Sequence, residues 1–71
     1  MGWISVKDRL PENNTEALYL WLDTRGYGHA GWFEAADPIW EEEAYFYRPD
    51  SRQFTLDEVT HWMPFPEPPK N

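Results

Sequence analysis

His29 and His61 are the two imidazole side chains of this chain, a type that commonly serves as an acid–base group or a metal ligand. His61 follows Asp57 and Glu58 closely in the sequence. A metal site needs about three or four converging ligands, and the spacing of these residues gives no support for one. The absence of Cys excludes thiolate ligands and a cysteine nucleophile. We therefore expect structural or surface roles, with His61 hydrogen-bonded to residues 8–12.

The other acid–base candidates also have simpler structural explanations. Asp8 and Arg9 can form an acid–base or anion-binding pair, but adjacent residues of these types commonly cap a turn and pair with each other. The carboxylates from Glu41 to Glu43 include paired acids, yet glycosidase chemistry needs a deep sugar cleft, which so short a chain has little volume to enclose. The sequence has no nucleophile elbow around Ser5 and no Gly-rich phosphate loop. We expect neither enzyme activity nor a cofactor.

The charge balance limits the classes of partner. The chain has 13 acidic residues against six basic ones, which gives a net charge of −7. This charge opposes binding to nucleic-acid backbones and to anionic membranes. It permits a basic protein partner, including a nucleic-acid-binding protein, although negative charge also serves simply to keep small domains soluble.

Short aromatic and β-branched runs, bounded by turn-forming residues, predict a mainly β protein. In residues 16–24 leucines alternate with Tyr19 and Trp21, so both faces are apolar and this strand belongs in the middle of the sheet. We expect a small curled antiparallel sheet of about four or five strands, at most one short helical turn at 36–43, and a Pro-rich C-terminal tail of polyproline type. The predicted strands cover residues 3–6, 16–24, 29–35, 44–48 and 59–63.

Aromatic residues must supply most of the core. The chain has five Trp, four Tyr and four Phe, and each buried ring removes about 150–250 Å² from water. We expect Trp3, Trp21 and Trp62 to be core residues. One small core does not hide so many rings, and an open sheet exposes unpaired backbone groups at its edges. We therefore expect a homo-oligomer.

The two ends of the chain carry distinctive strings, WISVKDRLPE at residues 3–12 and VTHWMPFPEPP at residues 59–69. Together they resemble the hallmarks of a phage and prophage family, domain of unknown function 551, although Phe65 stands where that family usually has Leu. The resemblance implies an accessory gene of tailed phages and supplies no catalytic residue. We expect a single domain, residues 1–71, whose two ends form an adjacent pair of scaffold strands around a variable centre, 13–58.

The expected function is binding and inhibition of a host defence or regulatory protein by a non-enzymatic phage accessory protein. Trp40 lies within an acidic run, where it either folds back into the core or anchors an interface. Because no apolar run resembles a signal peptide or a membrane span, we expect a location in the bacterial cytoplasm. The candidate protein-binding residues are Glu34, Asp37, Trp40, Glu41, Glu42 and Glu43.

An alternative function is the binding of a small ligand. An oligomer with aromatic pockets can sequester a nucleotide-type signal by stacking the base on a ring. Such a site also needs cations gathered around the phosphate. The candidate residues for this function are Arg9, Arg25, Arg48 and Arg52.

Overall fold

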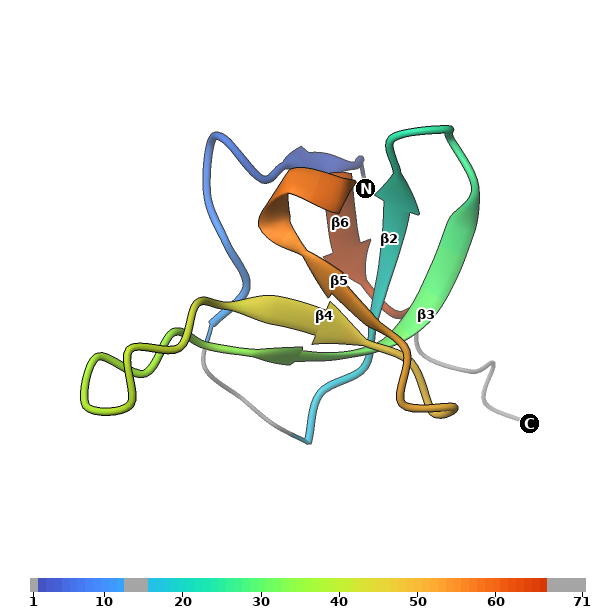
Figure 1. Ribbon diagram of the computed structural model, residues 1–71. Coiled ribbons are helices and arrows are strands. Elements are labelled where there is room, and N and C mark those ends of the chain that lie inside the picture. The colour runs from blue at the N-terminus through green and yellow to red at the C-terminus, as the bar shows by residue number, and fades with distance from the viewer. Residues whose placement is uncertain (1, 13–15, 67–71) are drawn as a thin grey trace.

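The computed structural model describes residues 2–12 and 16–66, which form six antiparallel strands and one turn of 3-10 helix (Figure 1). The strand order across the sheet is β1-β6-β2-β3-β4-β5. The mainly β prediction is confirmed, and the sheet has one strand more than expected, because the three residues of β5 are too few to stand out in the sequence. The elements are β1 (Ile4–Ser5), β2 (Tyr19–Asp23), β3 (Gly28–Glu34), β4 (Tyr45–Tyr47), β5 (Gln53–Thr55), η1 (Leu56–Glu58) and β6 (Val59–Pro64).

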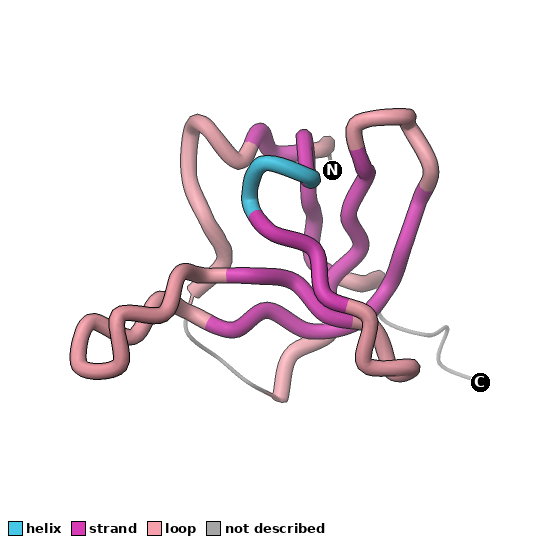
Figure 2. The backbone as a smooth tube through the Cα atoms, in the orientation of Figure 1, coloured by secondary structure: helices cyan, strands magenta, loops and turns pink. Residues whose placement is uncertain are grey.

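Strand β3 joins the two halves of the sheet. Its first half pairs with β2, up to Tyr19 opposite Gly31, and its second half pairs with β4, from Trp32 opposite Tyr47. A side chain at Gly31 would overlap the carbonyl oxygen of Tyr47, so the close approach of β4 requires glycine here. The sheet curls about this strand, and β4 and β5 cross in front of β2 and β6 (Figure 2).

The core lies inside the curl and consists largely of rings. Trp21 of β2 is fully buried, and its ring centroid lies 5.1 Å from that of Phe46 and 5.6 Å from that of Phe54. Phe33 packs on Phe46 at 5.0 Å. One ring from each of the strands β2, β3, β4 and β5 therefore meets at the centre of the core. Strand β2 lies between two neighbouring strands, as the sequence predicted. The core also includes Tyr19, Ala44, Val59 and Trp62.

The two hallmark ends are neighbours in space, as expected. Strand β1 pairs with β6, with Ile4 opposite Trp62. The indole N–H of Trp62 donates a hydrogen bond of 2.9 Å to the carbonyl oxygen of Arg9. Trp62, rather than His61, is therefore the side chain that ties the last strand to residues 8–12. This pairing gives a physical reason for the two distant strings to occur together.

The prediction that Trp3 belongs to the core is wrong. Its side chain is 44% exposed, whereas Trp62 is 5% exposed. Successive residues of an extended segment point to opposite sides, and here Ile4 packs against the core. Trp3 is consequently directed away from the core, directly before β1, which lies beside β6 at one edge of the described sheet.

An irregularity in β6 changes which residues face inward. Strict alternation from Trp62 would turn Val59 outward together with His61, but Val59 is buried. The register with β2 shifts here, since Leu22 lies opposite His61 while Asp23 lies opposite Val59. Thr60 is the extra residue, so this β-bulge brings both Val59 and Trp62 into the core. Sequence periodicity cannot reveal such a shift.

The polyproline tail expected after β6 falls partly outside the described residues. Within them, the strand ends at Pro64 as predicted. The backbone N–H of Phe65 donates to the carbonyl oxygen of Leu18 at 3.1 Å, so the chain is still held to the start of β2 at this point.

The turn between β2 and β3 closes on a buried carboxylate that the sequence analysis did not single out. Asp23, 6% exposed, accepts hydrogen bonds from the backbone N–H groups of Arg25 and Tyr27 at 2.9 and 3.0 Å. Its second oxygen accepts a hydrogen bond of 2.9 Å from His29 Nε2. The bond from His29, together with the two backbone N–H groups, lowers the pKa of Asp23 to about 2. A single carboxylate thus organises the hairpin.

The two glycines of β3 allow a paired test of the curl. Gly31→Ala should lower the free energy of unfolding by roughly 1–3 kcal/mol, because the new methyl group meets backbone atoms that cannot move without breaking the β3–β4 pair. Gly28→Ala meets nothing within 4 Å and should change stability by less than about 0.5 kcal/mol. Urea denaturation of both variants measures this, and equal stabilities would contradict the role of Gly31.

Two Trp→Ala variants test the assignment of the core. Trp62→Ala should cost roughly 3–5 kcal/mol, which is enough to unfold a domain of this size. Trp3→Ala, the same change at an exposed site, should cost only about 1 kcal/mol. Thermal and urea melts monitored by circular dichroism measure both. A Trp62→Ala protein that melts like the wild type would refute this core.

The buried carboxylate predicts a pH dependence. The pKa of Asp23 in the folded chain lies below its ordinary value of 3.8, so its stabilising contribution is complete above about pH 4 and disappears as the pH falls through about 2. Asp23→Asn should therefore be less stable than the wild type at neutral pH, and this difference should shrink toward pH 2. Urea midpoints across this range measure it, with exposed Asp57→Asn as the control. A difference that does not vary with pH would contradict the assignment.

Candidate interaction surface

Residues 36–43, here called the arm, form a closed hairpin between β3 and β4 rather than a helical turn. Asp37 and Glu42 exchange two backbone hydrogen bonds of 2.9 and 3.0 Å. The Asp37 carboxylate also accepts a hydrogen bond of 3.0 Å from the N–H of Ile39, and Glu41 adopts a left-handed conformation with φ of 55°. Hydrogen bonds within the arm thus order its tip.

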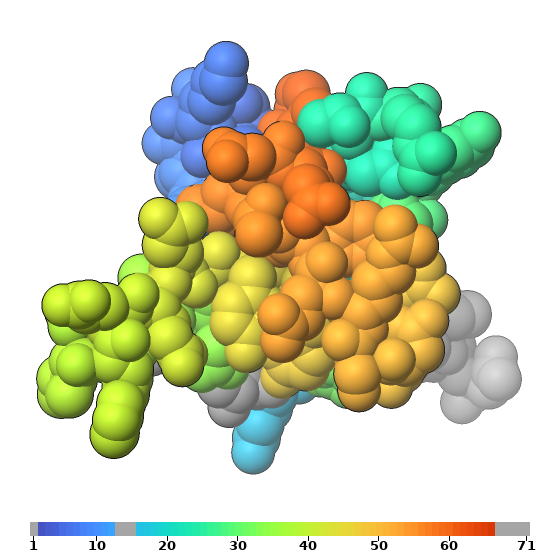
Figure 3. Space-filling view, in the orientation of Figure 1, coloured from blue at the N-terminus to red at the C-terminus, as the bar shows by residue number. Residues whose placement is uncertain are grey.

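The tip of the arm is apolar and open to solvent. Ile39 is 84% exposed and Trp40 is 74% exposed. The arm projects from the body of the molecule (Figure 3). Of the two alternatives considered for Trp40, the structure places it outside the core. A large apolar pair held at an exposed tip has the properties of an interface anchor.

The acidic residues predicted to bind a partner are divided between the arm and its base. Glu41, Glu42 and Glu43 are exposed on the arm, beside the apolar tip. The carboxylate of Asp37 already accepts a hydrogen bond from the backbone N–H of Ile39 within the arm. Glu34 lies at the end of β3, where it faces Tyr45 across the strand pair. The structure therefore places five of the six predicted residues on the arm and Glu34 just before its base.

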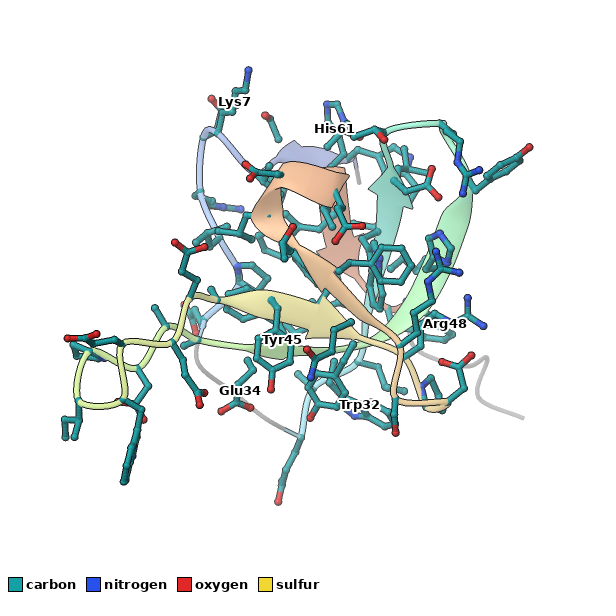
Figure 4. The ribbon with its side chains drawn as sticks, viewed as in Figure 1. Lys7, Trp32, Glu34, Tyr45, Arg48 and His61 are labelled. Atoms are coloured by element: carbon teal, nitrogen blue, oxygen red, sulfur yellow. The ribbon has the colours of Figure 1, made fainter. Side chains whose placement is uncertain are left out.

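Three aromatic rings lie on the outer face of β3 and β4, and we call them the aromatic face: Trp32, Tyr45 and Tyr47. The sequence did not predict a site at these residues. The ring centroids of Trp32 and Tyr47 are 5.5 Å apart, and those of Tyr45 and Tyr47 are 5.8 Å apart. All three are half-buried, and Trp32, Glu34 and Tyr45 lie close to one another in Figure 4. The available signal was the run of consecutive aromatic residues in each strand, Trp32 and Phe33 in β3 and Tyr45 to Tyr47 in β4, because successive residues of a strand point to opposite faces.

An open hollow of about 340 Å³ connects the arm to the aromatic face. Burial raises the pKa of the Tyr45 hydroxyl, and the nearby carboxylates of Glu34 and Glu42 raise that pKa further. Glu34 and Glu42 therefore place negative charge close to this edge of the face. The hollow is lined by Glu42, Glu43, Ala44, Tyr45, Gln53 and Thr55.

The arginines considered for a phosphate site do not gather in one place. Arg25 and Arg52 line one small hollow, but they share it with Asp23 and Glu58, so its charges balance. Arg52 lies over the ring of Phe54 at 5.0 Å.

The other two arginines are in different surroundings. Arg48 forms an ion pair of 2.7 Å with Asp50 in the turn between β4 and β5. Arg9 lines a larger groove of about 640 Å³, together with residues that include Trp62 and Phe65. Within residues 2–12 and 16–66, the four arginines therefore do not form the cluster of cations that a phosphate group would need.

Two features are absent from residues 2–12 and 16–66. These residues contain no group of three or more His, Asp or Glu side chains arranged to hold a metal ion. They also contain no helix that is long and apolar enough to span a membrane.

Comparison with known proteins agrees with the resemblance carried by the two ends. Residues 2–70 match the model of a family described as protein of unknown function (DUF551). Over 69 residues, or 97% of each chain, the sequence is 33% identical to an uncharacterized 7.8 kDa protein of Salmonella phage P22, from the ral-gp17 intergenic region. No solved structure matches the chain. The chain therefore belongs to the phage family of proteins of unknown function DUF551.

Proposed function

We propose that this protein is a non-enzymatic phage accessory protein that binds and inhibits a basic host protein of a defence or regulatory system through the arm. The observation that carries the proposal is the exposed pair Ile39 and Trp40 at the tip of a hydrogen-bonded hairpin. The DUF551 family and its phage relative support the phage context.

The apolar tip can supply much of the binding energy. A tryptophan that buries about 150 Å² in a complex contributes roughly 4 kcal/mol at about 25 cal/mol per Å². Trp40 and its neighbour Ile39 are both largely exposed in the free chain, so most of their surface is available for burial. Because backbone hydrogen bonds already close the arm between Asp37 and Glu42, binding has less conformational entropy to remove.

The carboxylates around the tip favour a basic partner. Glu41, Glu42 and Glu43 are exposed, and the whole chain carries a net charge of −7. Such a surface attracts a positively charged protein over a distance and raises the association rate, in a manner that salt weakens. A nucleic-acid-binding groove on the partner would be blocked by this acidic arm, which gives inhibition a simple physical basis.

The geometry gives less support to the nucleotide-binding alternative. A phosphate site needs cations that are not neutralised by their neighbours, whereas Arg48 is paired with Asp50 and the hollow of Arg25 and Arg52 also contains two acids. Arg9 lines a different groove. We therefore place protein binding first.

Site-specific photocrosslinking in bacterial cells tests the proposed contact. A benzophenone amino acid at position 40 should give discrete crosslinked host proteins, because Trp40 lies at the contact. The same amino acid at position 27 is the control, since Tyr27 is 62% exposed but lies on the turn between β2 and β3. An absence of crosslinks from position 40, or the same products from both positions, would exclude the arm as the binding surface.

Charge reversal tests the electrostatic part of the proposal. With the partner identified by crosslinking, Glu41→Lys together with Glu43→Lys should slow association by roughly tenfold or more at low salt, with a smaller effect at high salt. Asp8→Lys together with Asp57→Lys makes the same change in net charge at exposed sites outside the arm and should have a smaller effect. Stopped-flow or surface-based kinetics measures the rates. Equal effects of the two double variants would contradict a role for the arm acids.

A further inference from the structure

We infer that the aromatic face binds an arginine side chain from an extended segment of the partner, with its guanidinium group in the hollow beside Tyr45. The inference rests on the proposed function in taking the partner to be a basic protein. It adds a second contact, on the outer side of the sheet, whose residues Trp32, Tyr45 and Tyr47 differ from those at the tip of the arm.

The rings provide the first half of the site. Trp32 and Tyr47 face each other across β3 and β4, and Tyr45 continues the row along β4. A planar cation is attracted to the faces of Trp and Tyr rings within about 6 Å of their centroids. The protein uses this contact internally, because Arg25 lies 5.3 Å from the centroid of Tyr27 and Arg52 lies over Phe54.

Carboxylates provide the second half of the site. Glu34 lies directly opposite Tyr45 in the strand register, and Glu42 and Glu43 line the hollow on its other side. The raised pKa of the Tyr45 hydroxyl, caused first by burial, agrees with the closeness of Glu34 and Glu42 to the ring. A guanidinium group can stack on a ring while donating to a carboxylate, which the more strongly hydrated ammonium group of lysine does less well. Rings and acids together therefore fit arginine.

No arginine from the described part of the chain occupies this site. Arg48 follows Tyr47 directly, but its guanidinium is paired with Asp50 at 2.7 Å. The two arginine–ring contacts in residues 2–12 and 16–66 involve Tyr27 and Phe54, not the aromatic face. A phosphate-bearing ligand would be repelled by the three carboxylates. Charge complementarity therefore favours a cation supplied by another protein.

A binding experiment with defined peptides tests the arginine site without the host partner. The isotope-labelled full chain is titrated with the peptide acetyl-Arg-Gly-Arg-Gly-Arg-amide, and in parallel with the same peptide containing citrulline, which is neutral and nearly isosteric. The indole N–H signal of Trp32 and the backbone signals of Tyr45 and Tyr47 should shift in a saturable manner with the arginine peptide. Affinity for the citrulline peptide should be at least about tenfold lower.

Matched variants separate the ring from the carboxylates. Tyr45→Leu removes the ring and Glu34→Gln removes one charge, so each should lower the affinity for the arginine peptide by at least about threefold. Tyr45→Phe retains the ring and should keep most of the affinity. Tyr27→Leu, at the exposed turn between β2 and β3, is the control and should bind as the wild type does. Two-dimensional spectra of each variant confirm that it is folded.

The outcomes distinguish this site from the proposed function. Equal binding of the arginine and citrulline peptides, unchanged binding by Tyr45→Leu and Glu34→Gln, or shifts that do not involve Trp32 would overturn the arginine site. If position 40 still crosslinks to a host protein in that case, the proposed function stands. Conversely, a responsive aromatic face without crosslinks from position 40 supports the arginine site and rejects the arm.

Discussion

The close approach of β4 to Gly31 is the constraint on which the rest of this structure depends. Because no side chain stands between Gly31 and the carbonyl of Tyr47, β3 can leave β2 and continue beside β4 within a few residues. The resulting curl brings Phe46 and Phe54 onto Trp21. A flat sheet of such short strands would leave these rings on an open surface, because residues 2–12 and 16–66 form one sheet without a second layer to cover them.

The core and the aromatic face are two sides of the same strand pair. Phe33 and Phe46 point into the curl, while Trp32 and Tyr47 point outward from the neighbouring positions. A shift of the register by one residue would exchange the two sets and lose both the core and the outer row of rings. The packing of the inner rings fixes the register of the two strands and therefore also the positions of the outer rings. The geometry of the candidate interaction surface thus depends on the same contacts that stabilise the core.

The arm is the place where this strand pair extends past the sheet. Beyond Glu34 and Tyr45 none of the strands in the described part of the chain covers the hairpin, so its residues have little to pack against and Ile39 and Trp40 remain exposed. The backbone bonds between Asp37 and Glu42 preserve its shape without a core. A rigid scaffold that presents a short and variable loop is a common arrangement for binding proteins. In this chain the scaffold is closed by the pairing of its two ends, through Ile4 and Trp62.

The sequence by itself determined the features that depend on neighbouring residues. Alternation identified β2 as a central strand, glycines located the hairpin after it, and the acidic run located the arm. Features that depend on contacts between distant residues were decided only by the tertiary structure. Among these are the short strand β5, the exposure of Trp3, the bulge at Thr60 and the burial of Asp23 against His29. The aromatic face belongs with them, since Trp32 and Tyr47 become neighbours only through the register of two strands, and register is set by core packing rather than by local sequence.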